Sequence, residues 1–260
     1  MQAVILAAGR GSRLSSVIQD RPKALIPLGN TSLIQYQIAT LRRFGIENIC
    51  LILGYRADDV KRVVGDNFHF IINERYAETN SLYSLSLAQD WVRGAFVLSN
   101  CDVLAHPSIY RRLLATPGNV LAYDSASGGD EEEMKVIFKR GKLRQISKAL
   151  CPTQAQGESI GLLKFEAWSV DTYFREVQAA LAVGGENQWS PAALQRLVSK
   201  RPMGGVDLIG LPWVEIDFPE DYVAARQCIW PQIRAGSRAM AASFLYQMPT
   251  HNKLAYGAMT

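Results

Sequence analysis

The residue types best suited to chemistry stand near the N-terminus, in a loop of small residues that follows a short apolar run. Residues 6–14 read LAAGRGSRL, and Arg13 adds a fixed positive charge whose planar fork suits phosphate oxygens. Small residues at these positions would let main-chain N–H groups approach an anionic ligand closely. The residues that we expect to contact such a ligand are Leu6, Ala7, Ala8, Gly9 and Gly11.

This loop differs from two common phosphate-binding loops. It lacks the Gly-Lys-Ser/Thr ending of a P-loop, and Leu14 stands where a dinucleotide-binding fingerprint has its third glycine. A plain strand-to-loop turn with surface arginines would have the same composition. The loop by itself therefore leaves both interpretations open.

A second candidate cation, Lys23, follows in Arg21-Pro22-Lys23. Beside a proline and close behind the loop, it could bring a further positive charge to a polyphosphate. A single lysine in such a place is usually an exposed loop residue. The prediction depends on the order and separation of the two motifs.

Three carboxylates are candidates for a metal site. Asp102 follows a predicted strand, and Glu215 and Asp217 flank one residue, so both point to the same side of an extended chain. Mg²⁺ binds a few carboxylate oxygens and keeps water or phosphate oxygens in its other positions. Asp102 could instead end a strand or cap a helix, and the Glu-x-Asp pair could lie on a solvated strand face.

The elements that must position these residues alternate between strands and helices in the first hundred residues. We expect the helix at 31–44 to be capped by Thr31 and ended by Gly45. Such alternation indicates βαβ units and a mainly parallel sheet, whose ligands bind beyond the carboxyl ends of the strands. The predicted strands are 2–6, 48–53, 68–72 and 95–99, and the predicted helices are 31–44, 57–64 and 81–92.

The second half of the sequence predicts a polar loop at 125–133 and a β-hairpin that turns at Arg140-Gly141. The fold class is therefore α/β, a Rossmann-like mixed, mainly parallel sheet with flanking helices and a small β-hairpin insertion. We expect one domain over residues 1–230, with 124–165 as its hairpin region, and a C-terminal extension at 231–260 whose role the sequence does not reveal. Further elements are predicted at 157–165, 170–181, 190–198, 206–209, 214–216 and 219–228.

Composition excludes several classes of protein. The net charge of +4 on 260 residues comes without a compact basic run, which argues against nucleic acid as a partner. No apolar run reaches the length of a membrane span. Four scattered cysteines fit a reducing cytoplasm without disulfides, and three dispersed histidines do not make a metal site. A homodimer is compatible with the sequence, which does not fix the oligomeric state.

The two N-terminal motifs together resemble the nucleotidyltransferases of the sugar-1-phosphate type, which begin LAAGxGxRL and continue with Pro-Lys. The resemblance extends over residues 1 to about 230 and is strongest at the N-terminus. Within that superfamily, residues 78–85 (ETNSLYSL) resemble the TNxxYSL segment of phosphocholine and 2-aminoethylphosphonate cytidylyltransferases. Residues 157–161 and 213–217 are similar to the same branch.

The resemblance implies transfer of a nucleotidyl group, CMP from CTP, to a small phosphorylated or phosphonate acceptor such as phosphocholine or 2-aminoethylphosphonate. Pyrophosphate is then released and Mg²⁺ is the cofactor. Arg13 and Lys23 would bind the leaving phosphates, and Lys148, which follows the hairpin, would bind the acceptor phosphate. The implied metal ligands are Asp102, Glu215 and Asp217.

The base or ribose pocket has three candidates, Glu78, Asn80 and Ser84, because each buried donor or acceptor of the nucleotide needs a polar partner. Asn80 could equally cap the helix that begins at Ser81.

The chain departs from the phosphocholine enzymes at one place. They have a Trp-Asp pair before a helix, whereas this chain has Trp189-Ser190, which weakens the prediction of choline; Glu186 could replace the aspartate. Two alternatives remain, a sugar-1-phosphate nucleotidyltransferase that uses another NTP and a catalytically silent nucleotide-sensing subunit. The retained carboxylates and Lys23 argue against the second. An NAD-dependent oxidoreductase is disfavoured by Leu14 and by the lack of an acidic ribose partner.

Overall fold

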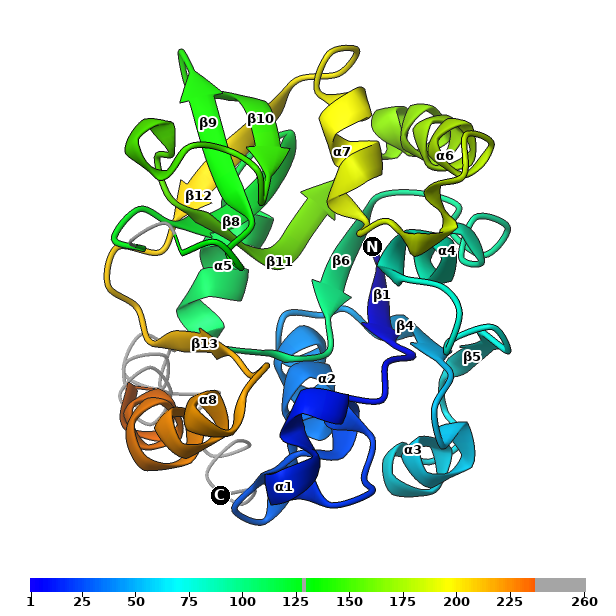
Figure 1. The fold of residues 1–260 in the computed structure, drawn as a ribbon, viewed down its shortest axis with the longest axis vertical. Helices are drawn as coiled ribbons and strands as arrows, with labels where there is room; N and C mark the ends of the chain where they lie inside the picture. The colour runs from blue at the N-terminus through cyan, green and yellow to red at the C-terminus, as the bar shows by residue number, and fades with distance from the viewer. Residues whose placement is uncertain (128–129, 237–260) are drawn as a thin grey trace, which may run out of the picture.

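The computed structural model describes residues 1–127 and 130–236 (Figure 1). Its centre is a mixed nine-stranded sheet in which β1 lies between β6 and β4, all three parallel. The order continues from β4 to β5 on one side and from β6 to β11 on the other. The strands of this parallel part are β1 (Gln2–Ala7), β4 (Asn48–Leu53), β5 (His69–Ile72) and β6 (Phe96–Asn100).

The antiparallel part of the sheet starts at β11, which pairs with β6, β8 and β9. The hairpin β9–β10 forms one end of the sheet, and β12 runs parallel to β8. Arg140 and Gly141 both have positive φ at the hairpin turn, as a tight two-residue turn requires. The strands here are β8 (Asn119–Asp124), β9 (Lys135–Lys139), β10 (Lys142–Ser147), β11 (Glu158–Phe165) and β12 (Met203–Asp207).

Helices cover both faces of the sheet, and the residues of β1 show why this strand is apolar throughout. Val4 and Leu6 pack with α4, α6 and α7 on one face, whereas Ala3 and Ile5 pack with α2, α3 and α5 on the other. Strands buried on both faces are hydrophobic without alternation. The six helices are α2 (Leu33–Arg43), α3 (Ala57–Val64), α4 (Ser81–Ser86), α5 (Pro107–Ala115), α6 (Ala167–Leu181) and α7 (Pro191–Leu197).

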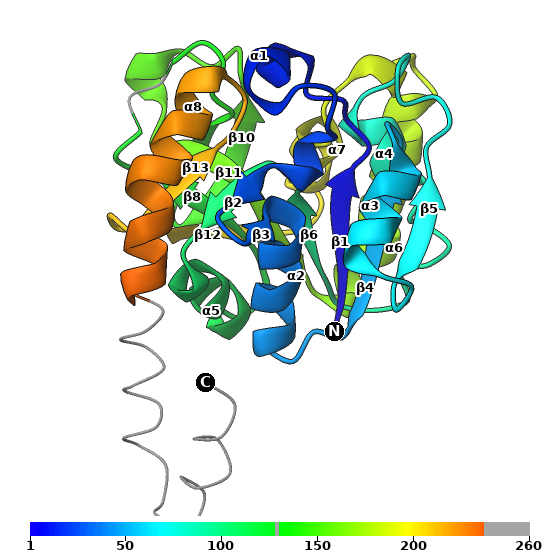
Figure 2. The same cartoon turned by 90° about the horizontal axis from the view of Figure 1, so that it is seen from below.

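A third apolar cluster joins the loop after β1 to the C-terminal part of the described chain. Leu14 and Ile26 pack there with Ile216, Tyr222 and Ile233. Figure 2 shows α8 beside β13 along one edge of the molecule. The elements involved are α1 (Ser15–Ile18), β2 (Pro27–Leu28), β3 (Thr31–Ser32), β7 (Val103–Ala105), β13 (Trp213–Glu215) and α8 (Pro219–Ala224).

The predicted α/β fold with a hairpin insertion is confirmed, two local predictions need correction, and one segment received no prediction. Ser32, not Thr31, caps α2, because Ser32 and Gln35 form a reciprocal capping box. The helix predicted at 81–92 ends at Ser86 and continues as turns. No element was predicted between 103 and 124, where the structure has β7, α5 and β8.

The predicted boundary at 230 stays a prediction. The helix that follows α8 continues to residue 236, and Ile233 packs into the third cluster. The rest of the predicted C-terminal extension, 237–260, lies outside the described residues. Within the described part of the chain, no helix is both long and apolar enough to cross a membrane.

Candidate active site

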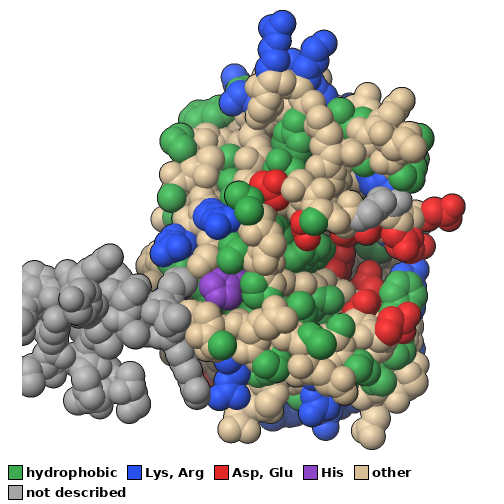
Figure 3. Space-filling model, turned by 90° about the vertical axis from the view of Figure 1, so that its left-hand side faces the viewer, with side chains coloured by type: hydrophobic (Ala, Val, Ile, Leu, Met, Phe, Trp, Pro, Cys, Tyr) green, Lys and Arg blue, Asp and Glu red, His purple; other side chains and the backbone are tan. Residues whose placement is uncertain are grey.

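A cavity of about 390 Å³ opens at the carboxyl ends of β1 and β6, where the parallel sheet predicts a ligand site. Figure 3 shows Asp and Glu side chains gathered around a hollow on one side of the molecule. Most of the predicted site residues line this cavity, namely Leu6, Ala8, Gly9, Gly11, Arg13, Lys23, Asn80, Ser84, Asp102, Lys148, Glu215 and Asp217. Ala7, at the end of β1, and the exposed Glu78 do not line it.

The loop after β1 is held in shape by one glycine and one buried leucine. Gly11 has φ 73°, and a Cβ at this position would lie 3.0 Å from Cβ of Lys23, so a larger residue would be strained and crowded. Leu14 is fully buried and anchors the far end of the loop. Arg13 between them remains half-exposed, with its guanidinium 5.0 Å from the centre of the Phe218 ring.

Lys23 joins this loop to two of the predicted metal carboxylates. Its Nζ donates to Oδ2 of Asp102 at 2.8 Å and to Oδ1 of Asp217. Burial by itself would lower the pKa of Lys23, but the charges of Asp102 and Asp217 outweigh it and raise this pKa well above its ordinary value. The ammonium therefore stays charged at any physiological pH.

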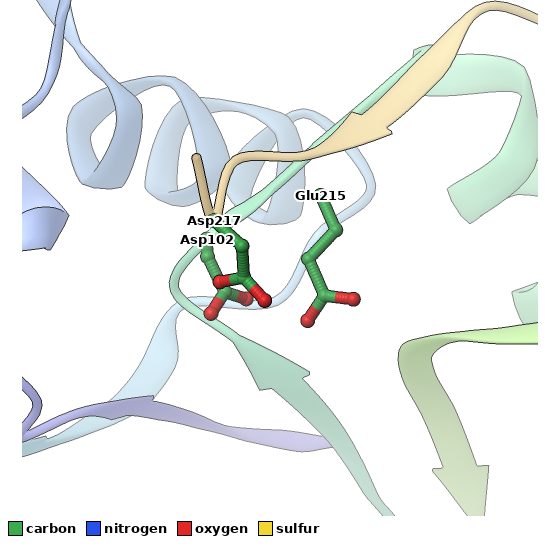
Figure 4. A group of neighbouring side chains, drawn as sticks. All are labelled: Asp102, Glu215 and Asp217. Carbon is green, nitrogen blue, oxygen red and sulfur yellow. The ribbon is translucent and has the colours of Figure 1, made fainter. Parts of the chain in front are cut away.

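Glu215 completes a group of three carboxylates. One ligand oxygen from each of Asp102, Glu215 and Asp217 lies within 4.8 Å of the others, and Figure 4 shows the three side chains close together in front of the turn after β6. Burial, together with the charges of Asp102 and Asp217, raises the pKa of Glu215 well above its usual range. The three carboxyl groups can carry more negative charge than the single ammonium of Lys23 neutralises.

Neighbouring elements fix the two aspartates. Gln37 of α2 is fully buried, and its Nε2 donates to the main-chain oxygens of Asn100 and Val103, each at 2.8 Å, on either side of Asp102. The main-chain N–H of Asp217 donates to Oδ2 of Asp221, which also caps α8. These bonds hold the turn after β6 and the start of α8, and so hold the carboxylates.

The segment before α4 forms the wall of the cavity near the loop after β1. Asn80 does cap α4, since its Oδ1 accepts from the N–H of Ser81 at 2.7 Å, and Asn80 also lines the cavity. Ser84 is buried and its Oγ accepts from Nδ2 of Asn73 at 3.0 Å. Glu78 instead lies 3.6 Å from the guanidinium of Arg75.

A second group of cavity-lining residues combines a cation, a carboxylate and an aromatic ring. Lys148 lies 3.1 Å from Oε2 of Glu132, and its Nζ lies 5.2 Å from the centre of the Trp189 ring. Glu132 also lies 3.7 Å from Arg13. The sequence prediction did not include Glu132, although it belongs to the run of four acidic residues in the loop before the hairpin.

Glu186, which was considered as a replacement for the missing aspartate, is engaged elsewhere. Both of its carboxylate oxygens accept from the guanidinium of Arg75, at 3.0 and 2.7 Å, and it does not line the cavity. Ser190, which stands in the aspartate's place, is buried and lines the cavity. The carboxylate beside Lys148 and Trp189 therefore comes from Glu132.

The sequence of the chain is similar to those of known nucleotidyltransferases. Residues 3–165 match the sequence profile of the MobA-like NTP transferase domain family. A CTP:phosphoglutamine cytidylyltransferase of Campylobacter jejuni is 27% identical over 251 residues, which are 85% of this chain and 97% of that protein. A choline-phosphate cytidylyltransferase of Streptococcus pneumoniae is 38% identical over 101 residues, but this match covers only 38% of this chain and 43% of that protein.

Solved structures agree on the fold. The inositol-1-phosphate CTP transferase of T. maritima superposes with a TM-score of 0.76 over 90% of this chain and 94% of its own, at 23% identity. The CTP:phosphocholine cytidylyltransferase of Streptococcus pneumoniae superposes with a TM-score of 0.70 over 87% of this chain and 97% of its own, at 22% identity.

The profile match confirms the resemblance to nucleotidyltransferases that the N-terminal motifs indicated. The relatives named as cytidylyltransferases confirm that the chain is similar to the cytidylyltransferase branch. The profile match covers more than half of the chain. The chain therefore belongs to the MobA-like NTP transferase domain family and is a nucleotidyltransferase.

Proposed function

We propose that this nucleotidyltransferase transfers CMP from CTP to a small phosphorylated or phosphonate acceptor that carries a positive charge, and releases pyrophosphate. The observation that carries the proposal is that two charged groups of side chains line one cavity. Three carboxylates and Lys23 form the first group, here called the carboxylate end, and Lys148, Glu132 and Trp189 form the second, here called the acceptor end. Such a cavity offers a place for a nucleotide and a place for an acceptor.

Mg²⁺ fits the carboxylate end. Oδ1 of Asp102 is buried and has no hydrogen-bond partner among the described residues, although a buried carboxylate oxygen usually has one. A hard cation is the partner that carboxylate oxygens at this spacing favour. Bound by Asp102, Glu215 and Asp217, the ion would supply positive charge to the phosphate oxygens of the nucleotide.

The chain's own residues suit an in-line displacement at the α-phosphorus. An acceptor phosphate oxygen forms a bond to this phosphorus while the bond to the bridging oxygen breaks, and that electron pair leaves with pyrophosphate. The attacking oxygen is already anionic, so the step needs positioning and charge neutralisation rather than a general base. In this proposal Arg13 and Lys23 bind the leaving phosphates, and Lys148 binds the acceptor phosphate.

A cationic group on the acceptor is supported by Trp189 and Glu132. The Trp189 side chain is 51% exposed, and its ring already lies near one ammonium, that of Lys148. An aromatic face attracts cations, and a nearby carboxylate adds opposite charge. Glu132 would supply this charge in a chain that has Ser190 where the phosphocholine enzymes have an aspartate.

The preference for CTP is supported by the relatives that are named as cytidylyltransferases and by residues 78–85, which supply Asn80 and Ser84 to the cavity wall. We further propose that the enzyme works in the cytoplasm, because all four cysteines are free.

The test is pyrophosphate release with Mg²⁺, with four NTPs crossed against phosphocholine, phosphoethanolamine, 2-aminoethylphosphonate, inositol-1-phosphate and hexose-1-phosphates. Release with CTP and one cationic acceptor is the expected result. Release with inositol-1-phosphate or a hexose-1-phosphate alone would contradict the cationic acceptor, and release with another NTP alone would contradict the base preference.

A further inference from the structure

Lys135 is a charged residue buried beneath the acceptor end of the cavity, at the start of β9. Its side chain is 1% exposed and does not line the cavity, whereas the neighbouring Met134 does. The Lys135 Nζ donates to the main-chain oxygen of Lys148 at 2.9 Å and to that of Glu133 at 3.5 Å. One buried ammonium thus contacts both segments that carry charge at the acceptor end.

This position is costly for an ammonium, because burial removes its hydration and main-chain oxygens replace only part of it. Glu158 offers opposite charge from β11, where it pairs in register with Lys135. A methionine of similar length would fill the same space without the desolvation cost. What distinguishes Lys135 from such an apolar residue is the pair of hydrogen bonds that it donates.

The hydrogen bonds from the Lys135 ammonium lie at the end of the pairing between β9 and β10. Lys135 pairs with Ser147, the last residue of β10, and Lys148 follows directly. The carbonyl of Lys148 therefore lies beyond the paired strands and is held by the Lys135 ammonium. The carbonyl of Glu133 is held in the same way, next to Glu132.

We propose that Lys135 is a positioning residue for nucleotidyl transfer, which fixes the main chain at Lys148 so that the Lys148 ammonium meets the acceptor phosphate. The inference rests on the acceptor role proposed above for Lys148. A long side chain reaches fewer positions when its own main chain is fixed, and small displacements of a binding group weaken catalysis strongly.

The experiment compares Lys135→Met with Lys164→Met. Lys164 in β11 is also buried, at 3% exposed, and its Nζ also donates to a main-chain oxygen, that of Thr116 at 2.5 Å, but it does not line the cavity. We expect K135M to raise KM for the acceptor about tenfold and KM for CTP less than about twofold. K164M should change neither.

A neutral donor gives a second variant. Lys135→Gln keeps a donor on a shorter side chain without the charge, and its KM for the acceptor should fall between those of the wild type and K135M. If K135M does not fold, Lys135→Ala, which leaves both main-chain oxygens without this donor, replaces it, and a wild-type KM for the acceptor in folded K135A overturns the inference.

The route through Lys148 is tested with Lys148→Ala. If Lys135 acts through Lys148, adding K135M to K148A raises the acceptor KM no further. An unchanged acceptor KM in K135M, an equal rise in both KM values, or a full additional effect in the double variant would overturn the inference. A wild-type acceptor KM in K148A would instead refute the role of Lys148 itself, and the single variant reports this directly.

Discussion

At the scale of single residues, Lys23 has the most constrained environment of the predicted cations. Its ammonium lies against Asp102 and Asp217, whereas Arg13 remains half-exposed. The sequence predicted Lys23 as a cation of the site from its motif. Its contact with the two aspartates could not be predicted, because the three residues are far apart in the chain and meet only in the folded protein.

Lys23→Ala removes positive charge where the triphosphate is proposed to bind. We expect kcat to fall by about 10²–10³, comparable to the loss of one preorganised electrostatic donor in other enzymes. Lys142→Ala, at an exposed position of the hairpin, is the matched control and should keep wild-type kcat. Steady-state pyrophosphate release measures both, and equal kcat values in the two variants would contradict the assignment.

At the scale of elements, helix α2 holds the turn that carries Asp102. Gln37 was not predicted as a site residue because, in the sequence, it is an ordinary polar residue of a predicted amphipathic helix. Its two hydrogen bonds to main-chain oxygens become visible only when α2 packs beside β6 and β7. A local pattern predicts the helix but not the carbonyls that it meets.

Gln37→Leu should therefore lower both stability and activity. Two buried carbonyls lose a shared donor, which costs about 2–4 kcal/mol of the free energy of unfolding. The looser turn should also raise the Mg²⁺ concentration needed for half-maximal activity. Gln178→Leu on the exposed face of α6 is the control. Urea unfolding and Mg²⁺ titration measure the two effects; Q37L with wild-type values of both would refute the role of Gln37.

A second prediction at this scale concerns Glu158 in β11. Burial, together with the charges of Glu133 and Asp124, raises the pKa of Glu158 to about 7, although Ser127 and Lys135 oppose the shift. The folded chain therefore binds more protons than the unfolded chain between about pH 4.5 and 7. The contribution of this group to stability is present below that range and is lost as the pH rises through it.

Glu158→Gln should remove this loss. Relative to the wild type, the variant should gain on the order of 2 kcal/mol of unfolding free energy between pH 5 and pH 8. Urea unfolding of both proteins at several pH values measures the difference. A difference that stays constant with pH would contradict the raised pKa.

At the scale of the whole molecule, the parallel half of the sheet was predictable and the antiparallel half only in part. Strand 48–53 and helix 57–64 were predicted with the bounds that the structure has, because each is a short periodic segment between clear turn signals. The segment 103–124 received no prediction, yet β8 lies inside the sheet. Its place depends on pairing with β11 and β12, which are distant in sequence.

The site residues, too, were predictable where they belong to the parallel half of the sheet and less so elsewhere. Residues at the ends of predicted parallel strands, such as Asp102, met in the cavity because such ends share one edge of a sheet. Glu132 and Trp189 reach the cavity from a loop and from a helix start in the second half. No local pattern indicated how these segments fold back over the sheet.

The central claim is that the carboxylate group around Asp102 serves nucleotidyl transfer, and Asp102→Asn tests it most directly. The amide keeps the size of the side chain but removes the negative charge that would bind Mg²⁺. Pyrophosphate release is measured for the wild type, D102N and the control Asp90→Asn, which is exposed beyond α4, with unfolding curves to show that each variant is folded. We predict that folded D102N loses activity by at least about 10² while D90N keeps it. Wild-type turnover by folded D102N at the same Mg²⁺ concentration would contradict the account.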